Sequence, residues 1–176
     1  MRRSLTIERL DDLMREIAGS YRARRAVRVF IVGGGTAVHF GWRHSTIDAD
    51  LYSDDPGVFD DIQSMKERLQ LNIEFARPEN FVPALRGSKA RHLFIKTIGK
   101  VSFLHYDPYA QMLSKVVRGF RQDLLDAQNF LSSGMVDPVH FRSLVYSIPE
   151  TEFQKYPALS RDAVLDAVDD FFEQSE

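Results

Sequence analysis

The chain has 176 residues, of which 44% are hydrophobic and 27% charged, and its formal net charge is −2. These values predict one globular domain, or one domain with a helical extension, and they exclude a strongly basic nucleic-acid-binding domain. The absence of cysteine excludes disulfides and thiolate metal sites and favours a cytoplasmic protein. No apolar stretch approaches the ~20 residues of a membrane span, and early acidic residues argue against a signal peptide.

The N-terminal two thirds of the chain mix helical and extended patterns. Apolar residues at helical spacing predict a first helix over residues 5–24. An apolar strand at 29–32 then ends in three glycines, and a short helix is expected from Thr36. Further on we expect a short strand carrying Asp48 and Asp50, a helix over 58–71, a strand at 72–75 with Ile73 and Phe75 facing the core, a loop over 77–91, and a hairpin of strands 93–97 and 101–106.

The last third of the chain reads as helical. Asp107 followed by Pro108 predicts a capped helix that runs to about Arg118. Three more helices are expected over residues 121–131, 138–147 and 160–172. The predicted fold class is therefore α/β (α+β), with a mixed sheet of about four or five strands flanked by helices. We expect residues 1–106 to form the core and 107–176 a helical region packed with it into one compact unit.

The glycine corner at Gly33–Gly35 allows three interpretations. It partly matches a dinucleotide-binding fingerprint, but the third glycine of that motif would fall on Val38. A Walker loop is excluded because no Gly-Lys-Ser/Thr follows. A tight strand-to-helix turn without a ligand is the third interpretation. Bare backbone at the start of a helix suits phosphate, since free N–H groups point at an anion there.

Asp48 and Asp50 are expected to point to the same face of one strand, because alternate strand residues do so. Two carboxylates side by side suit Mg²⁺, which takes oxygen ligands and often shares them with phosphates. An aspartyl-phosphate phosphatase would need an apolar strand where Ser45 and Thr46 stand, and a sugar transferase usually has a longer chain. A nucleotidyltransferase needs the pair a short helix after a glycine corner, as found here.

Seven residues of this region resemble the signature GG-T…R-x-[ST]-x-D-x-D of the DNA polymerase β-like nucleotidyltransferase superfamily: Gly34, Gly35, Thr36, Arg43, Thr46, Asp48 and Asp50. Arg43 lies one residue earlier than the arginine of that signature. The likeness is strongest to the small bacterial AbiEii-like and MNT-like proteins of toxin–antitoxin systems. Their helical K-x-x-R…D-x-x-D segment is similar to Lys115, Arg118, Asp123 and Asp126, and the resemblance covers residues 30–131.

The resemblance implies a Mg²⁺-dependent enzyme that moves a nucleoside monophosphate from a nucleoside triphosphate (NTP) to a hydroxyl. It implies that two Mg²⁺ ions are held by the catalytic carboxylates Asp48, Asp50 and Glu74. It implies nucleotide binding by Gly34, Gly35, Thr36, Arg43, Thr46 and Lys115. The acceptor would be RNA, such as tRNA, or a protein, and a cognate toxin or antitoxin would be a partner. The alternative is a non-catalytic NTP-binding or toxin–antitoxin partner protein with a degenerate form of the fold.

The third carboxylate has two candidates. Glu74 is expected on the strand after Asp50, on the face opposite the core, whereas the position of Asp107 is explained by helix capping. Asp123 and Asp126 are three residues apart on a helix, and we expect them to form ion pairs with basic residues such as Arg118 or Arg121. The five histidines are scattered and lack metal-ligand spacing.

Overall fold

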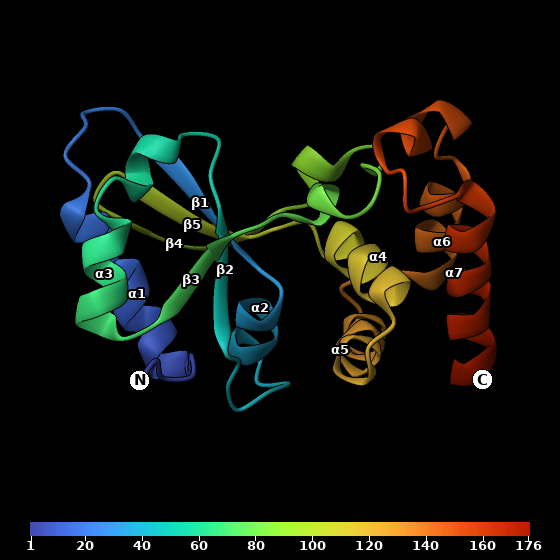
Figure 1. Cartoon of the computed structure of the whole chain (residues 1–176), viewed down its shortest axis with the longest axis horizontal. Coiled ribbons are helices and arrows are strands. Elements are labelled where there is room, and N and C mark those ends of the chain that lie inside the picture. The colour runs from blue at the N-terminus through green and yellow to red at the C-terminus, as the bar shows by residue number, and fades with distance from the viewer. The chain divides into compact units, whose positions relative to one another are not determined.

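The computed structural model describes all 176 residues and divides into two compact units (Figure 1). The first unit comprises residues 1–77 and 93–106, and the second comprises residues 78–92 and 107–176. The sequence predicted a boundary between the core and the helical region at residues 106 and 107. The structure has a boundary there too, but it also assigns the segment 78–92 to the second unit. Each unit is described by itself.

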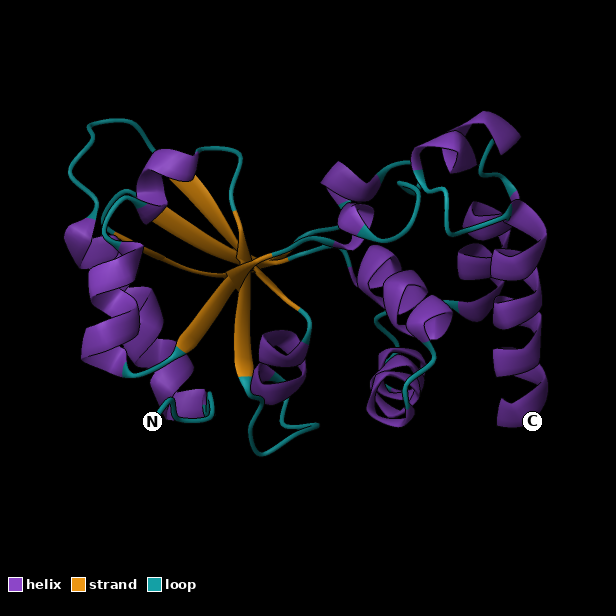
Figure 2. Cartoon of the chain, viewed as in Figure 1, coloured by secondary structure: helices purple, strands orange, loops and turns teal.

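A five-stranded mixed sheet forms the centre of the first unit (Figure 2). Its strand order is β3-β2-β1-β5-β4, so β1 lies in the middle. The β1–β5 and β2–β3 pairs are parallel, and the β1–β2 and β4–β5 pairs are antiparallel. The strands are β1 (Val27–Val32), β2 (Asp48–Tyr52), β3 (Asn72–Phe75), β4 (Leu93–Ile98) and β5 (Val101–His105). The predicted α/β class with about four or five strands is confirmed.

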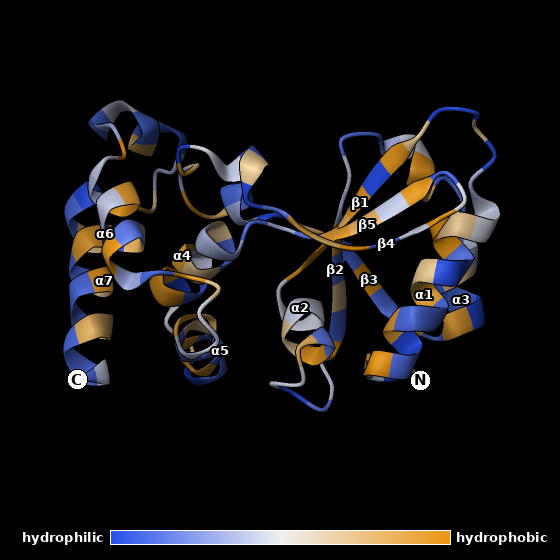
Figure 3. Ribbon diagram, turned by 180° about the vertical axis from the view of Figure 1, so that it is seen from behind, coloured by the Kyte–Doolittle hydropathy of each residue, from blue (hydrophilic) through white to orange (hydrophobic).

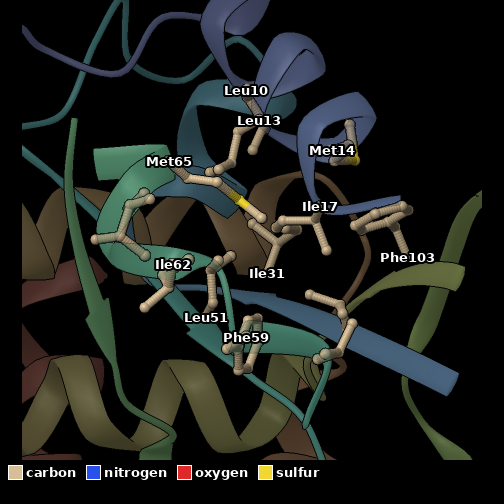
Figure 4. Close-up of a cluster of buried hydrophobic side chains, with 14 of the residues drawn as sticks. Leu10, Leu13, Met14, Ile17, Ile31, Leu51, Phe59, Ile62, Met65 and Phe103 are labelled. Carbon is tan, nitrogen blue, oxygen red and sulfur yellow. The ribbon is translucent and has the colours of Figure 1, made fainter. Parts of the chain in front are cut away.

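Helices α1 (Ile7–Ser20), α2 (Gly34–His39) and α3 (Ile62–Leu69) belong to the same unit. The Thr6 hydroxyl caps α1 by accepting a hydrogen bond from the Arg9 N–H. Figure 4 shows side chains of α1 and α3 packed against inward-facing residues of the sheet. This core includes Leu10, Leu13, Ile17, Ile31, Leu51, Met65 and Phe103, each at most 1% exposed.

The second unit is helical. It contains α4 (Pro108–Arg118), α5 (Arg121–Ser132), α6 (Pro138–Tyr146) and α7 (Arg161–Ser175). Short 3₁₀ turns at Pro78–Asn80, Ser88–Ala90 and Glu150–Lys155 complete it. Hydrophobic and hydrophilic residues alternate around α7 (Figure 3), and its buried residues are Val164, Val168 and Phe171. The predicted helical C-terminal region is confirmed, and none of the helices has the length and apolar character needed to cross a membrane.

Three local predictions differ from the structure. The single helix expected over 58–71 is a 3₁₀ turn, Pro56–Phe59, followed by α3, because Asp60 and Asp61 favour a turn between them. The expected loop over 77–91 contains two of the 3₁₀ turns. Phe75, expected in the core, is 53% exposed, since it ends the short edge strand β3 and contacts Phe59 instead.

Candidate functional site

Two aspartates stand on the outer face of β2. Ala49 and Leu51 point into the core and are each 1% exposed, whereas Asp48 and Asp50 point the other way and are half-buried. The alternation expected for this strand is therefore confirmed. It brings both carboxylates to one face, as strand geometry requires.

The neighbouring strand β3 adds a third carboxylate to this face. The parallel register pairs Asp50 with Glu74 and Asp48 with Asn72. The Asn72 side-chain amide donates hydrogen bonds to the Asp48 carboxylate and, at 3.3 Å, to Glu74 Oε1. Glu74 is exposed. Asn72 thus links two of the predicted catalytic carboxylates, a role that the sequence did not indicate.

The glycine turn between β1 and α2 packs against these carboxylates. Gly33 has a φ of +63°, which side chains rarely adopt, and a Cβ placed on it would lie 2.8 Å from Asp50 Oδ2. A Cβ on Gly34 would collide with the Thr46 side chain. The absence of side chains is therefore what allows the turn to lie directly against Asp50 and Thr46.

Thr46 is held in place by the segment that precedes α1. Its N–H and carbonyl form two backbone hydrogen bonds with Leu5, at 3.0 and 2.7 Å. Arg43 lies in the loop between α2 and β2, where its N–H donates to the Ala37 carbonyl at 3.4 Å. The Leu5–Thr46 bridge spans 41 residues of sequence and could not be read from local patterns.

Behind the turn, His105 contacts Thr36, and His39 in turn contacts His105. Thr36 is fully buried, and its hydroxyl donates to the Ile31 carbonyl at 3.3 Å and lies 3.0 Å from His105 Nδ1. His105 Nε2 lies 2.8 Å from His39 Nδ1. Burial, with a smaller effect of His39, lowers the pKa of His105 to about 3. Burial also lowers the pKa of His39, assisted by the charge on Lys96. Both rings are thus neutral near pH 7.

Lys115 lies in the second unit, inside a cluster of charges. Its Nζ is 2.7 Å from Asp126 Oδ2 and 3.5 Å from Asp123 Oδ1, and all three side chains are at most 8% exposed. Arg118 Nε is 3.4 Å from Asp123 Oδ2. The expected ion pairs of the two aspartates with basic residues are therefore observed, but Lys115, rather than an arginine, is the cation that contacts both aspartates.

Asp107 is occupied by contacts within the second unit. It is fully buried, and Arg91 forms a bidentate ion pair with it through Nε at 3.1 Å and Nη2 at 2.7 Å. It also caps α4 by accepting from the Tyr109 N–H at 2.9 Å. The capping predicted from Asp107-Pro108 is confirmed. These contacts use both carboxylate oxygens, which favours Glu74 as the third carboxylate.

One comparison with known proteins bears on these residues. A family model described as a nucleotidyltransferase of unknown function (DUF6036) matches residues 6–173, which is nearly the whole chain. The chain belongs to this nucleotidyltransferase family. No curated protein and no solved structure matched this chain. The family assignment supports a nucleotidyltransferase-like family and does not test the resemblance to the AbiEii-like and MNT-like branch.

The donor set of this nucleotidyltransferase-family protein fits a magnesium ion held jointly with a substrate. Asp48 and Asp50 supply two carboxylates on one face, and Mg²⁺ commonly uses one or two carboxylates with phosphate oxygens and water. No three His, Cys, Asp or Glu side chains are grouped as a self-sufficient metal site.

The close approach of Gly33 to Asp50 predicts that a side chain at position 33 destabilises this nucleotidyltransferase-family protein. We expect Gly33→Ala to lower the free energy of unfolding by about 1–3 kcal/mol, because a strained φ is combined with a clash. Gly99→Ala is the matched control, since Gly99 has a φ of +59° but nothing within 4 Å of the added Cβ. Urea denaturation should show a clearly smaller loss for Gly99→Ala. Equal losses would mean that the contact with Asp50 has no energetic consequence.

Proposed function

We propose that the protein is a Mg²⁺-dependent nucleotidyltransferase that moves a nucleoside monophosphate from an NTP, such as ATP, to a hydroxyl. The observation that carries this proposal is the packing of the glycine turn on Asp50. Gly33 and Gly34 lie against Asp50 and Thr46, which supports one site that combines the proposed phosphate-binding turn with the proposed metal-binding carboxylates. The family assignment supports the same reaction class.

In this proposal Asp48 and Asp50 hold two Mg²⁺ ions, and Glu74, which pairs with Asp50 across the sheet, assists. When bound, the metal ions lower the pKa of the attacking hydroxyl and neutralise triphosphate charge. Asn72 donates to Asp48 and Glu74 and thereby orients both carboxylates. The acceptor hydroxyl loses its proton to water as its oxygen attacks the α-phosphorus, the bond from the α-phosphorus to the bridging oxygen breaks, and pyrophosphate leaves.

Backbone N–H groups of Gly34 and Gly35 are proposed to contact the outer phosphates, because the first N–H groups of a helix have no partner within it. The Thr36 hydroxyl is used inside the protein, so we propose that Thr36 acts by supporting the turn. Arg43 is proposed to neutralise charge on pyrophosphate. A nucleotide contact by Lys115 stays a prediction, and its buried ion pairs favour a structural role.

The acceptor is proposed to be RNA, such as tRNA, or a protein in the cytoplasm. The resemblance to toxin–antitoxin proteins supports both acceptors and also a cognate toxin or antitoxin partner. Exposed arginines between α1 and β1, namely Arg22, Arg24 and Arg25, are compatible with a polyanionic acceptor.

Calorimetry combined with a pyrophosphate assay tests this function. Titration of each NTP with Mg²⁺ should give saturable binding for at least one of them. Addition of total RNA or lysate protein should then release pyrophosphate. Binding that is lost in the presence of EDTA would support the metal-dependent mode. Absence of binding for all four NTPs would contradict the proposal.

A second candidate, a non-catalytic NTP-binding protein, is favoured by two observations. Glu74 is exposed and bonded to Asn72, and the acidic side chains do not form a group of three. A protein of this kind would bind Mg²⁺–NTP without releasing pyrophosphate under any acceptor condition. The same two measurements therefore separate the candidates.

A further inference from the structure

A continuous hydrogen-bonded chain lies behind the glycine turn. It runs from His39 at the end of α2, through His105 at the end of β5, to the Thr36 hydroxyl and the Ile31 carbonyl of β1. His105 is 1% exposed and Thr36 is fully buried, so water cannot replace the contact between these two side chains. The sequence separates His39 from His105 by 66 residues.

Only one arrangement of protons satisfies this chain. The Ile31 carbonyl can only accept, so the single Thr36 proton is donated to it. The Thr36 oxygen must then accept from Nδ1–H of His105. A neutral imidazole has one donor, which leaves His105 Nε2 to accept from Nδ1–H of His39. Burial lowers the pKa of both rings, which agrees with these neutral forms.

Thr36 connects this chain to the turn itself. Its N–H donates to the Gly33 carbonyl at 3.1 Å, and the Ile31 carbonyl that accepts from its hydroxyl also accepts from the Tyr106 N–H at 3.0 Å. A Cβ on Gly35 would lie 2.9 Å from Ile31 Cγ2, so the turn also packs tightly on β1. Strand β1, strand β5 and helix α2 are thus fixed together at Thr36.

We propose that His105 is a positioning residue which, supported by His39, holds the Thr36 hydroxyl and thereby sets the glycine turn against Asp50. The inference deepens the proposed function and rests on it for the ligand. Movement of Thr36 displaces Gly33 and Gly34, which have no free space before Asp50 and Thr46. The geometry of the proposed phosphate-binding turn therefore depends on a side chain that is itself buried.

Three variants test this role. His105→Leu removes both ring nitrogens, His105→Asn keeps an N–H near the Nδ1 position, and Thr36→Val removes only the hydroxyl. Thr97→Val is the matched control, because Thr97 also pairs its hydroxyl with a side chain of the same sheet, at 2.8 Å from Ser102 Oγ, but is exposed.

The first readout is independent of any ligand. Nitrogen-15 NMR of the imidazoles should give Nδ1–H tautomers for His39 and His105 in the wild type. The amide shifts of Gly33, Gly34 and Gly35 should move in the same direction in His105→Leu and Thr36→Val and stay near wild type in His105→Asn. Unperturbed glycine shifts in His105→Leu would overturn the positioning role. If His105→Leu fails to fold, Thr36→Val decides by the same criterion.

The second readout is binding of inorganic tripolyphosphate in the presence of Mg²⁺. We expect His105→Leu and Thr36→Val each to weaken binding of tripolyphosphate about tenfold. The double variant should bind no more weakly than either single variant, because both substitutions remove the same hydrogen bond between His105 and Thr36. His105→Asn and Thr97→Val should bind nearly as the wild type does. Additive losses in the double variant would overturn coupling through Thr36. Absence of binding by the wild type would overturn the proposed function, while the NMR result would still judge the positioning role.

Discussion

Replacing both Asp48 and Asp50 by asparagine is expected to reduce nucleotidyl transfer by at least about a thousandfold. Asparagine keeps the size of each side chain but removes the two negative charges that the proposed metal ions require. The fold should be retained, because both side chains lie on the outer face of β2 and the core contacts of Ala49 and Leu51 are unchanged. Transfer would be measured with an α-labelled NTP, and folding by circular dichroism.

Asp54→Asn is the matched control for this double variant. Asp54 follows the C-terminal end of β2 and is exposed. Its carboxylate forms an ion pair with Arg28 and accepts a hydrogen bond from the Tyr52 hydroxyl. Its loss should leave transfer within about twofold of the wild type, since exposed ion pairs contribute little. Undiminished transfer by the Asp48/Asp50 variant would place the chemistry elsewhere in the chain.

Replacing Lys115 by methionine is expected to lower the free energy of unfolding by about 3–5 kcal/mol. The change takes the Lys115 cation away from the fully buried Asp126 and leaves Asp123, which is 6% exposed, with Arg118 as its cation; a buried carboxylate that loses its counter-charge is costly. Urea denaturation should be followed by circular dichroism. The one tryptophan, Trp42, lies in the first unit, so its fluorescence does not report on the helices of the second unit.

The double variant Lys115→Met/Asp126→Leu separates lost charge balance from lost packing. Removing the closest partner as well should restore most of the stability, because an apolar pair can replace a buried ion pair at little cost. Arg118 still faces the remaining Asp123. A loss below about 1 kcal/mol for Lys115→Met alone would contradict a structural role and would favour the predicted nucleotide contact.

The sequence predicted the elements that depend on local patterns. The alternation of Asp48, Ala49, Asp50 and Leu51 sufficed to place two carboxylates on one face, because strand geometry is periodic. Likewise, Asp107 before Pro108 sufficed to place the start of α4. These predictions needed no knowledge of how distant segments pack.

The contacts that long-range packing decides were not predicted. The Leu5–Thr46 bridge, the Asn72–Asp48 hydrogen bond and the His39–His105 pair all join separate segments of the chain. For His105 one signal was present: it follows Val101 and Phe103 at alternate positions, so it faces the core. A histidine in such a row needs a buried partner. That partner, Thr36, can be identified only from the packing.

The position of the label in the NTP tests the central claim most directly. Wild-type protein is incubated with Mg²⁺, RNA or lysate protein, and NTP labelled either at the α- or at the γ-phosphate. The nucleotidyltransferase account predicts that the α-label appears in the acceptor and that the γ-label appears in pyrophosphate, with neither product formed by the Asp48/Asp50 variant. Transfer of the γ-label to the acceptor, or α-label transfer that survives in that variant, would contradict the account.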